Sequence, residues 1–520
     1  MSLGFSGKIF KPDTPGYDQV NNIYATSTYG KERNMKPGAI YQPDNIKDIK
    51  EVFDVVSHSD KPIRVAVRTG GHQYSGASST NTEGIQLDLK TTFRHPVNDL
   101  QLTRKDGKVF IRSSVSWELK EFYEFLQEKR VFLPTGQCIT VCLGGHVQTG
   151  GYGMLGRSFG LLGDYITELE IINYTGEKVM ASKTSNPELF YGFLGGSPGN
   201  LGVLTHFTVE VQDDNNYKGS KGMWLLYRYK KSTLKNLLDI VVEKAEDPNF
   251  ERNYDFNINV YSEGINILDI FSADEDKLRD KLPKDVQNDR KNGVGLTLKV
   301  PVIVVYAQWV NFGNDAYNPE LFRRLKEAGG KIWLSPIVFE SAKDAPMSEI
   351  TSKWLFKHSR EFPYPYVKRT GSTNSTTLSK DGWSEWFSEQ INKANKQKGL
   401  FISSQIQVYG GNNSMFWKNA STNTAYSWRD ATVVGTWDIF HKNAQEAAEA
   451  WQKETDEGAL KYFDKNQRRL LWGSYGDWDM KKVWQHYYDE PTYRRLQQLR
   501  KDVDPNDVFN ANPFCVEAAK

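Results

Sequence analysis

Three features are scarce in this chain of 520 residues, and each scarcity excludes a class of protein. Only three cysteines occur, Cys138, Cys142 and Cys515, and the first two stand close together, so no disulfide framework is expected. The sequence has no run of about eighteen apolar residues, so no membrane span is predicted. Basic residues number 66 and acidic residues 64, and neither kind gathers in a long run, so no nucleic-acid or membrane partner is expected.

Targeting signals are scarce as well. The opening residues MSLGFSGKIFKPDTPGYD lack the basic stretch and apolar stretch of a signal peptide. Glycosylation sequons begin at Asn374, Asn412 and Asn419, but they matter only in a secreted protein. The compartment therefore stays open: the chain is secreted if it is a mature form and intracellular otherwise. A monomer without a metal site is expected.

Glycine is abundant and clustered. The stretch AIYQP, DIKEVFDVVSHS, IRVAVR has the pattern of strand, helix and strand, and it runs directly into TGGHQYSG. A second cluster spans 136–163, and LGGSPGNLGVLTHF holds a third. Glycine permits positive φ and close backbone approach to phosphates, so three such clusters favour a nucleotide ligand. Tight turns in large loops are the alternative. The GxGxxG at Gly151–Gly156 follows no apolar strand, which argues against a Rossmann site.

Composition divides the chain into three parts. The segment DDNNYKGSKG, which begins at Asp213, has the composition of a linker. Strands and amphipathic helices alternate after it to about residue 465, which predicts a separate α+β layer. We therefore expect a ligand-binding part at 1–212, a second domain at 213–464 and a C-terminal segment at 465–520.

The glycine clusters carry a specific resemblance. Three stretches resemble motifs of the berberine-bridge-enzyme-like family of the vanillyl-alcohol-oxidase flavoprotein superfamily. They are RTGGHQYSG at 68–76, GQCITVCLGGH at 136–146 and the following GGYG. The family's third FAD segment is similar to NPELFYGFLGGSPGNLGVLTHF. Its C-terminal signature is similar to YYDEPTYRRLQQLRKDVDPNDVF. The resemblance implies an α+β, two-domain FAD-binding fold, with a substrate domain built on an antiparallel sheet flanked by helices. The segment 465–520 would return to the FAD domain.

The resemblance also implies two covalent bonds to FAD, because His72 and Cys138 occupy the positions at which family members attach the cofactor. Imidazole and thiolate are nucleophiles that can add to the electron-poor flavin ring. Taken alone, His72 would be interpreted as a structural histidine and Cys138 as a small buried residue. Because both occupy the attachment positions of the family, covalent attachment is favoured. The other expected FAD-binding residues are Arg68, Thr69, Gly70, Gly71, Gln73, Tyr74, Ser75, Gly76, Val141, Gly144, Gly145, Gly150, Gly151, Gly153, Gly202 and Val203.

An alcohol oxidase needs a base that takes the hydroxyl proton. WGSYGDWDM at 472–480 resembles the family stretch whose second tyrosine reaches the active site, so Tyr475 is the expected base. An aromatic side chain that only packs on the flavin is the alternative. Asp430 could polarise Tyr475, although a carboxylate next to Arg429 is also typical of a plain ion pair.

Two glutamines complete the expected catalytic group. In SSQIQVYGG, Gln405 and Gln407 lie on one face of a strand that resembles the family strand bearing an active-site glutamate or glutamine. Neither side chain is ionisable, so they would orient a substrate or a phenol. A solvated strand face is the alternative.

The favoured function is a carbohydrate oxidase. Its bicovalently bound FAD would take a hydride from the anomeric carbon of a mono- or oligosaccharide, giving a lactone, and dioxygen would leave as hydrogen peroxide. Val141 occupies the position that resembles the family's oxygen gate, although it could simply be core. Two alternatives remain open: an oxidase of an alkaloid, monolignol or polyketide alcohol, and a flavin-bearing storage or binding protein without turnover.

Overall fold

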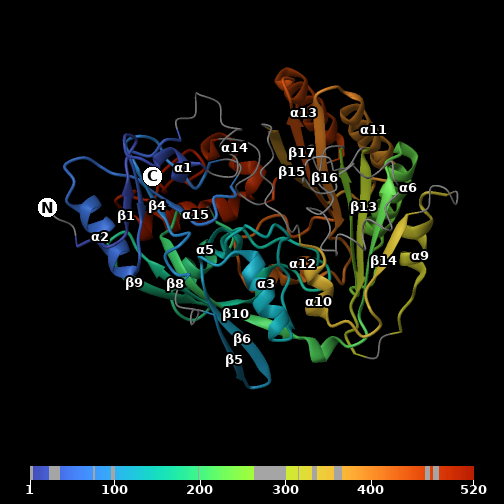
Figure 1. Ribbon diagram of the computed structural model, residues 1–520, viewed down its shortest axis with the longest axis horizontal. Coiled ribbons are helices and arrows are strands. Elements are labelled where there is room, and N and C mark those ends of the chain that lie inside the picture. The colour runs from blue at the N-terminus through green and yellow to red at the C-terminus, as the bar shows by residue number, and fades with distance from the viewer. Residues whose placement is uncertain are drawn as a thin grey trace.

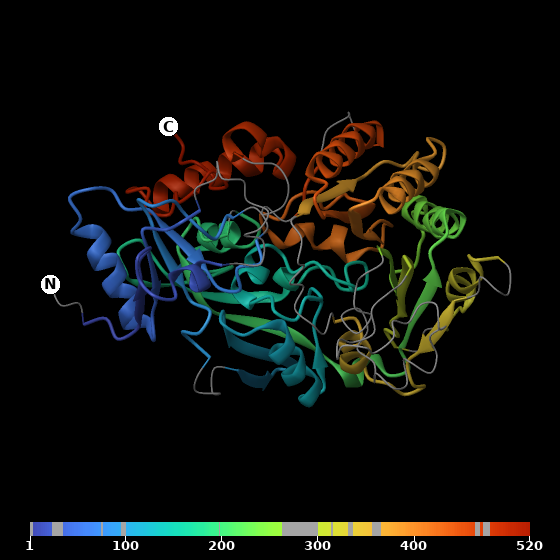
Figure 2. The same ribbon diagram turned by 45° about the horizontal axis from the view of Figure 1, so that its top comes forward.

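This computed structural model describes residues 4–22, 35–73, 76–94, 100–196, 198–262, 300–313, 316–330, 336–355, 366–462, 469–471 and 479–520. These residues form three β-sheets arranged in two halves (Figure 1). The first half combines the beginning and the end of the chain, and the second is built from its middle. In Figures 1 and 2 the teal segment that follows α3 runs between the two halves.

The first sheet has four strands in the order β1-β2-β4-β3. β1 pairs antiparallel with β2, and β2 and β3 both pair parallel with β4. The strands are β1 (Lys8–Phe10), β2 (Ala39–Gln42), β3 (Val65–Arg68) and β4 (Ile85–Asp88). Helix α2 (Ile46–Ser57) joins β2 to β3, so the expected strand, helix and strand are all present. The first glycine cluster therefore starts where β3 ends.

Helix α2 shows how the sequence specifies this layer. Its N-cap residue Asn45 accepts a hydrogen bond from the Asp48 amide at 3.1 Å, which satisfies one of the unpaired donors of the first turn. Ile49, Val52 and Phe53 then share one face of the helix and are buried. That spacing is typical of a helix that packs on a sheet.

The second sheet is antiparallel and has six strands, with the main order β5-β6-β10-β8-β9 and β7 paired to β10. The strands are β5 (Gln101–Lys105), β6 (Lys108–Ser114), β7 (Val131–Phe132), β8 (Ile166–Ile172), β9 (Lys178–Ser182) and β10 (Val203–Asp213). Helices α3 (Leu119–Glu128), α4 (Leu143–Gln148) and α5 (Pro187–Phe193) lie in its connections. Ile49 of α2, Leu87 of β4 and Val209 of β10 belong to one hydrophobic core, so the first two sheets fold together.

The third sheet has seven antiparallel strands in the order β14-β11-β13-β12-β16-β17-β15. The strands are β11 (Lys221–Arg228), β12 (Tyr254–Tyr261), β13 (Val302–Trp309), β14 (Ile337–Glu340), β15 (Tyr366–Thr373), β16 (Leu400–Val408) and β17 (Val433–His441). The helices on its outer side in Figures 1 and 2 are α6 (Lys231–Glu246), α9 (Glu320–Glu327), α11 (Trp383–Lys396) and α13 (Gln445–Ala459).

Both faces of this sheet are buried, and they differ in chemistry. On β12, Phe256, Ile258 and Val260 belong to the hydrophobic core under the helices. The alternate residues Asn257 and Asn259 are fully buried on the opposite face. Successive strand residues point to opposite faces, so β12 presents polar side chains toward the first half. On the same face, Val304 and Tyr306 of β13 belong to a hydrophobic core with Phe132.

The end of the chain returns to the first half. Helices α14 (Met480–Tyr487) and α15 (Glu490–Val503) lie there in Figure 1, and α15 contacts α5. The exact boundaries expected at 212/213 and 464/465 stay predictions.

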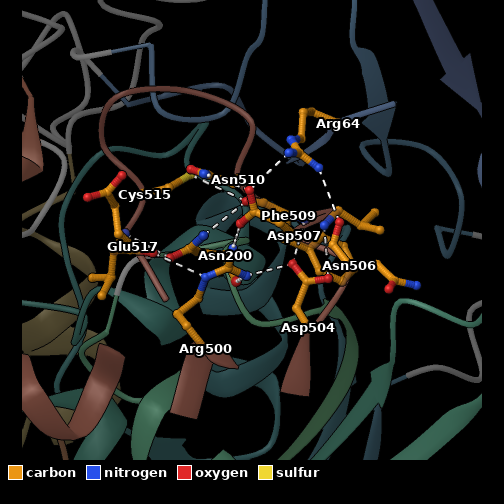
Figure 3. A network of polar contacts seen from close by, with 12 residues as sticks. Arg64, Asn200, Arg500, Asp504, Asn506, Asp507, Phe509, Asn510, Cys515 and Glu517 are labelled. Atoms are coloured by element: carbon orange, nitrogen blue, oxygen red, sulfur yellow. Dashed lines mark hydrogen bonds and ion pairs between the residues drawn. The ribbon is translucent and has the colours of Figure 1, made fainter. Parts of the chain in front are cut away.

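Figure 3 shows the polar contacts that hold this end in place. Arg500, which is fully buried, pairs with Asp504 at 2.7 Å and with Asp507 at 2.9 Å, and it also donates to the Asn200 carbonyl. The Asn200 side chain donates to the Phe509 carbonyl at 2.9 Å. The third glycine cluster is therefore fixed by Arg500 of α15 and by Phe509, which follows this helix.

Candidate functional site

A large pocket lies where the three glycine clusters meet strands β16 and β17 of the third sheet. It encloses about 1430 Å³, part of it open to solvent. Its wall includes residues of all three clusters, together with β16 and β17. The expected site residues found in the wall are Arg68, Thr69, Gly70, Gly71, His72, Gln73, Cys138, Val141, Gly144, Gly145, Gly153, Gln405 and Gln407.

Other expected residues lie behind this wall or outside the described part of the chain. Four glycines shape the segments through positive φ: Gly76 (79°), Gly150 (106°), Gly151 (70°) and Gly202 (144°). Val203 begins β10 next to the last of them. Tyr74, Ser75 and Tyr475 lie outside the described residues, so their roles stay predictions.

The loop after β3 packs directly on the second glycine cluster. Gly71 has φ of 66°, a conformation that glycine adopts without strain. A Cβ added to Gly70 would lie 2.8 Å from the Cys142 amide nitrogen, so only glycine allows this approach. His72 Nε2 is 2.8 Å from Thr140 Oγ1, two residues beyond Cys138. His72 and Cys138 thus stand on adjoining segments of one wall.

His146 is a site residue that the sequence interpretation did not select. Its Nε2 accepts a hydrogen bond from the Gly136 amide at 2.9 Å, and its side chain lines the pocket. Burial lowers the pKa of this imidazole to about 4, so it is neutral at pH 7 and carries its proton on Nδ1. The signal was present in the sequence, because Gly144-Gly145-His146 repeats the pattern Gly70-Gly71-His72.

Two donors in the pocket wall fit a phosphate-bearing ligand. Arg68 pairs through Nη2 with Asp88 at 2.7 Å, and both side chains are buried. Arg68 Nη1 and the buried Ser78 hydroxyl have no hydrogen-bond partner among the described residues. Buried polar groups are almost always paired, so these two donors suit the anionic oxygens of a dinucleotide. Ser78 lies two residues beyond the motif from which the site was predicted.

The opposite wall is polar and uncharged. Gln405 and Thr436 are paired across β16 and β17, and both are partly exposed in the pocket. Thr436 was not predicted, because the segment containing β17 carries no motif. Gln407 Nε2 donates instead to the Gly153 carbonyl at 2.9 Å. Among the described wall residues there is no aspartate or glutamate.

Asp430 does not belong to the described wall of this pocket. Its side chain is 47% exposed and pairs with Arg469 at 2.8 Å. The Asn374 side chain donates to the same carboxylate at 2.8 Å. Asp430 therefore forms an ion pair with Arg469 rather than Arg429. Its expected action on Tyr475 stays a prediction, because Tyr475 lies outside the described residues.

Comparisons with known proteins indicate an FAD binding domain in this part of the chain. Residues 37–182 match the model of an FAD binding domain family. Berberine bridge enzyme-like 4 from Arabidopsis thaliana is 23% identical over 482 residues, which cover 88% of this chain and 80% of that protein.

Two solved structures share the fold over the whole chain. The carbohydrate oxidase from Microdochium nivale matches with a TM-score of 0.71 at 19% identity, covering 100% of this chain and 98% of that one. The glucooligosaccharide oxidase from Acremonium strictum, which carries a 6-S-cysteinyl, 8α-N1-histidyl FAD, matches with a TM-score of 0.69 at 17% identity, covering 99% and 97%.

With this fold and a pocket suited to a flavin dinucleotide, the chain is an FAD-dependent oxidoreductase. It resembles the berberine-bridge-enzyme-like flavoproteins of the vanillyl-alcohol-oxidase superfamily in sequence and in fold. The expected α+β, two-domain fold is confirmed. The described residues contain no helix long and apolar enough to span a membrane. They also contain no cluster of acidic, histidine and cysteine side chains suited to a metal ion.

Proposed function

We propose that this protein oxidises the anomeric hydroxyl of a mono- or oligosaccharide to a lactone, with FAD bound covalently through His72 and Cys138. The reaction removes a hydride from carbon and a proton from oxygen, and dioxygen takes both electrons and two protons to give hydrogen peroxide. FAD, when bound, supplies the hydride acceptor. The observation that carries the proposal is a pocket with His72 and Cys138 on one wall and neutral hydrogen-bonding side chains on the other.

The neutral wall supports a sugar substrate. The Gln405 amide both donates and accepts hydrogen bonds, as the Thr436 hydroxyl does, so the pair suits the hydroxyls of a sugar. An alkaloid cation would favour a carboxylate, and the described wall has none. Tyr475 is the proposed base that takes the hydroxyl proton, and Val141 is proposed to lie where dioxygen approaches.

Covalent attachment is supported by the placement of both nucleophiles in the pocket wall and by the linkage in the Acremonium strictum enzyme. Its test is precipitation of the holoprotein with acid. We expect the flavin in the pellet for the parent protein and for each single variant, His72→Ala and Cys138→Ala. We expect it in the supernatant for the double variant. Free flavin from the parent protein would overturn the attachment.

Substrate class is tested by oxygen consumption and peroxide release. We expect turnover with glucose or cellobiose, and a Tyr475→Phe variant that still binds flavin but turns over poorly. Turnover with aromatic alcohols or alkaloids alone would overturn the sugar assignment. A flavin that no substrate reduces under anaerobic conditions would favour the storage protein instead.

A further inference from the structure

The backbone carbonyl of Gly153 accepts two side-chain hydrogen bonds from the third sheet. Gln407 Nε2 donates at 2.9 Å and Tyr409 Oη at 3.2 Å. Gln407 is 4% exposed and Tyr409 is 1% exposed, so water competes little for this carbonyl. Both donors come from β16 and the residue that follows it, the same strand that presents Gln405 to the pocket.

The other side of Gly153 is pressed against the segment that leads to Cys138. A Cβ added to Gly153 would lie 1.7 Å from the Thr135 carbonyl oxygen, so the two backbones are in direct contact. Thr135 precedes Gly136, whose amide is bonded to His146 at 2.9 Å. Gly153 therefore lies between the third sheet and the segment that carries Cys138.

The two donors keep their roles over the working pH range. An amide does not titrate, and burial raises the pKa of the Tyr409 phenol well above its usual value, so the hydroxyl keeps its proton. Packing holds the Tyr409 ring as well, because a Cβ added to Gly156 would lie 2.4 Å from it. Neither Gln407 nor Tyr409 has to move or ionise to hold Gly153.

We propose that Gln407 and Tyr409 are positioning residues that hold the Cys138 segment, through Gly153 and Thr135, at the place where the cysteinyl bond to the flavin forms. This inference rests on the attachment proposed above. Bond formation replaces the thiol hydrogen and one hydrogen of the flavin ring with a carbon–sulfur bond. The two electrons and two protons released reduce one dioxygen to hydrogen peroxide, so the step balances.

The test uses a His72→Ala parent, in which Cys138 is the remaining covalent link, and measures the flavin released by acid. Gln407→Met keeps the side-chain length without the donor, and Tyr409→Phe removes the hydroxyl alone. We expect both variants to release more flavin than the parent, and the double variant to release most of it. The matched control is Gln405→Met, on the same strand and face, which should form the bond as the parent does even though its turnover falls.

The outcomes separate this inference from the attachment itself. Equal bond formation in the parent and in the double variant overturns the inference. If the parent itself releases all its flavin, the attachment proposal fails. The positioning role is then read from FAD affinity, which the double variant must weaken by about tenfold, or about 1.4 kcal/mol. An unchanged affinity overturns it. Far-UV circular dichroism confirms that each variant is folded, and Tyr409→Phe alone is the milder variant if the double variant does not fold.

Discussion

The two walls of the pocket are built by different means. The FAD-binding wall is made largely of backbone, with glycines at positive φ and close contacts such as Gly70 on Cys142. The proposed substrate wall is made of side chains on regular strands, such as Gln405 and Thr436. A backbone wall depends on a few glycines and therefore leaves motifs in the sequence. A wall made of strand side chains changes its specificity through single substitutions, so it leaves no motif in the sequence.

The largest effect is expected for Arg500→Met, a variant that tests whether the contacts of α15 stabilise the backbone wall. Arg500→Met leaves Asp504 buried without its cation and removes a donor from the Asn200 carbonyl. Breaking a buried ion pair costs about 3 to 5 kcal/mol, so we expect a large fall in the unfolding temperature and a smaller fraction of the protein that incorporates flavin. Gln498→Ala, on the exposed side of α15, is the control and should stay within about 0.5 kcal/mol. A similar small change for Arg500→Met would contradict the support described in Figure 3.

A somewhat smaller effect is expected for a glycine within the wall. Gly153→Ala brings a methyl group to 1.7 Å from the Thr135 carbonyl oxygen, and overpacking of this kind costs about 1 to 3 kcal/mol. Thermal unfolding of the apoprotein measures it. Gly145→Ala is the matched variant, because nothing lies within 4 Å of its added Cβ, and its apoprotein should be as stable as the parent. Equal losses would mean that the close contacts do not decide which glycines are required.

The backbone wall also predicts a pH dependence. The His146 pKa is lowered to about 4 by burial, whereas the unfolded imidazole titrates near its ordinary value of about 6.5. The unfolded state therefore binds the extra proton first, and His146 lowers the free energy of unfolding as the pH falls from about 6.5 to 4. The loss is at most about 1.4 kcal/mol per pH unit. Chemical unfolding of the apoprotein at several pH values should show a shallower slope for His146→Gln. Identical slopes would mean that His146 is not buried in its neutral form.

The smallest effect is expected on the substrate side. Asp430→Asn should change the maximal rate by no more than about twofold, or about 0.4 kcal/mol, because the carboxylate is half exposed and held by Arg469. Steady-state kinetics with the best substrate, with Gln405→Met as the variant expected to lose activity, measures the difference. A loss of activity as large as that of Gln405→Met would support the catalytic role that the sequence predicts for Asp430.

The sequence carries motifs for the expected cofactor side and hardly any for the expected substrate side, for a physical reason. RTGGHQYSG and GQCITVCLGGH combine conformational and chemical demands, so few other residues satisfy them. The same reasoning missed Ser78 and Asn200, because their roles depend on contacts with segments distant in the chain, such as the bond from Asn200 to the Phe509 carbonyl. Gln405 and Gln407 were correctly placed on one strand face. Gln405 lines the pocket, whereas Gln407 donates to the Gly153 carbonyl. This difference depends on how the two halves of the molecule meet.

The contacts of the last segment have a consequence for biosynthesis. Asn512 donates to the carbonyls of Ala77 and Ser79 at 2.8 Å each, and Val508 accepts from the Val65 amide at 2.8 Å. Translation adds these residues hundreds of codons after the loop they hold. Domains usually fold as units while the chain is still being made, but this pocket depends on residues that are far apart in the chain. The loop after β3 can therefore take its final form only once residues 508–512 have been made and have packed against it.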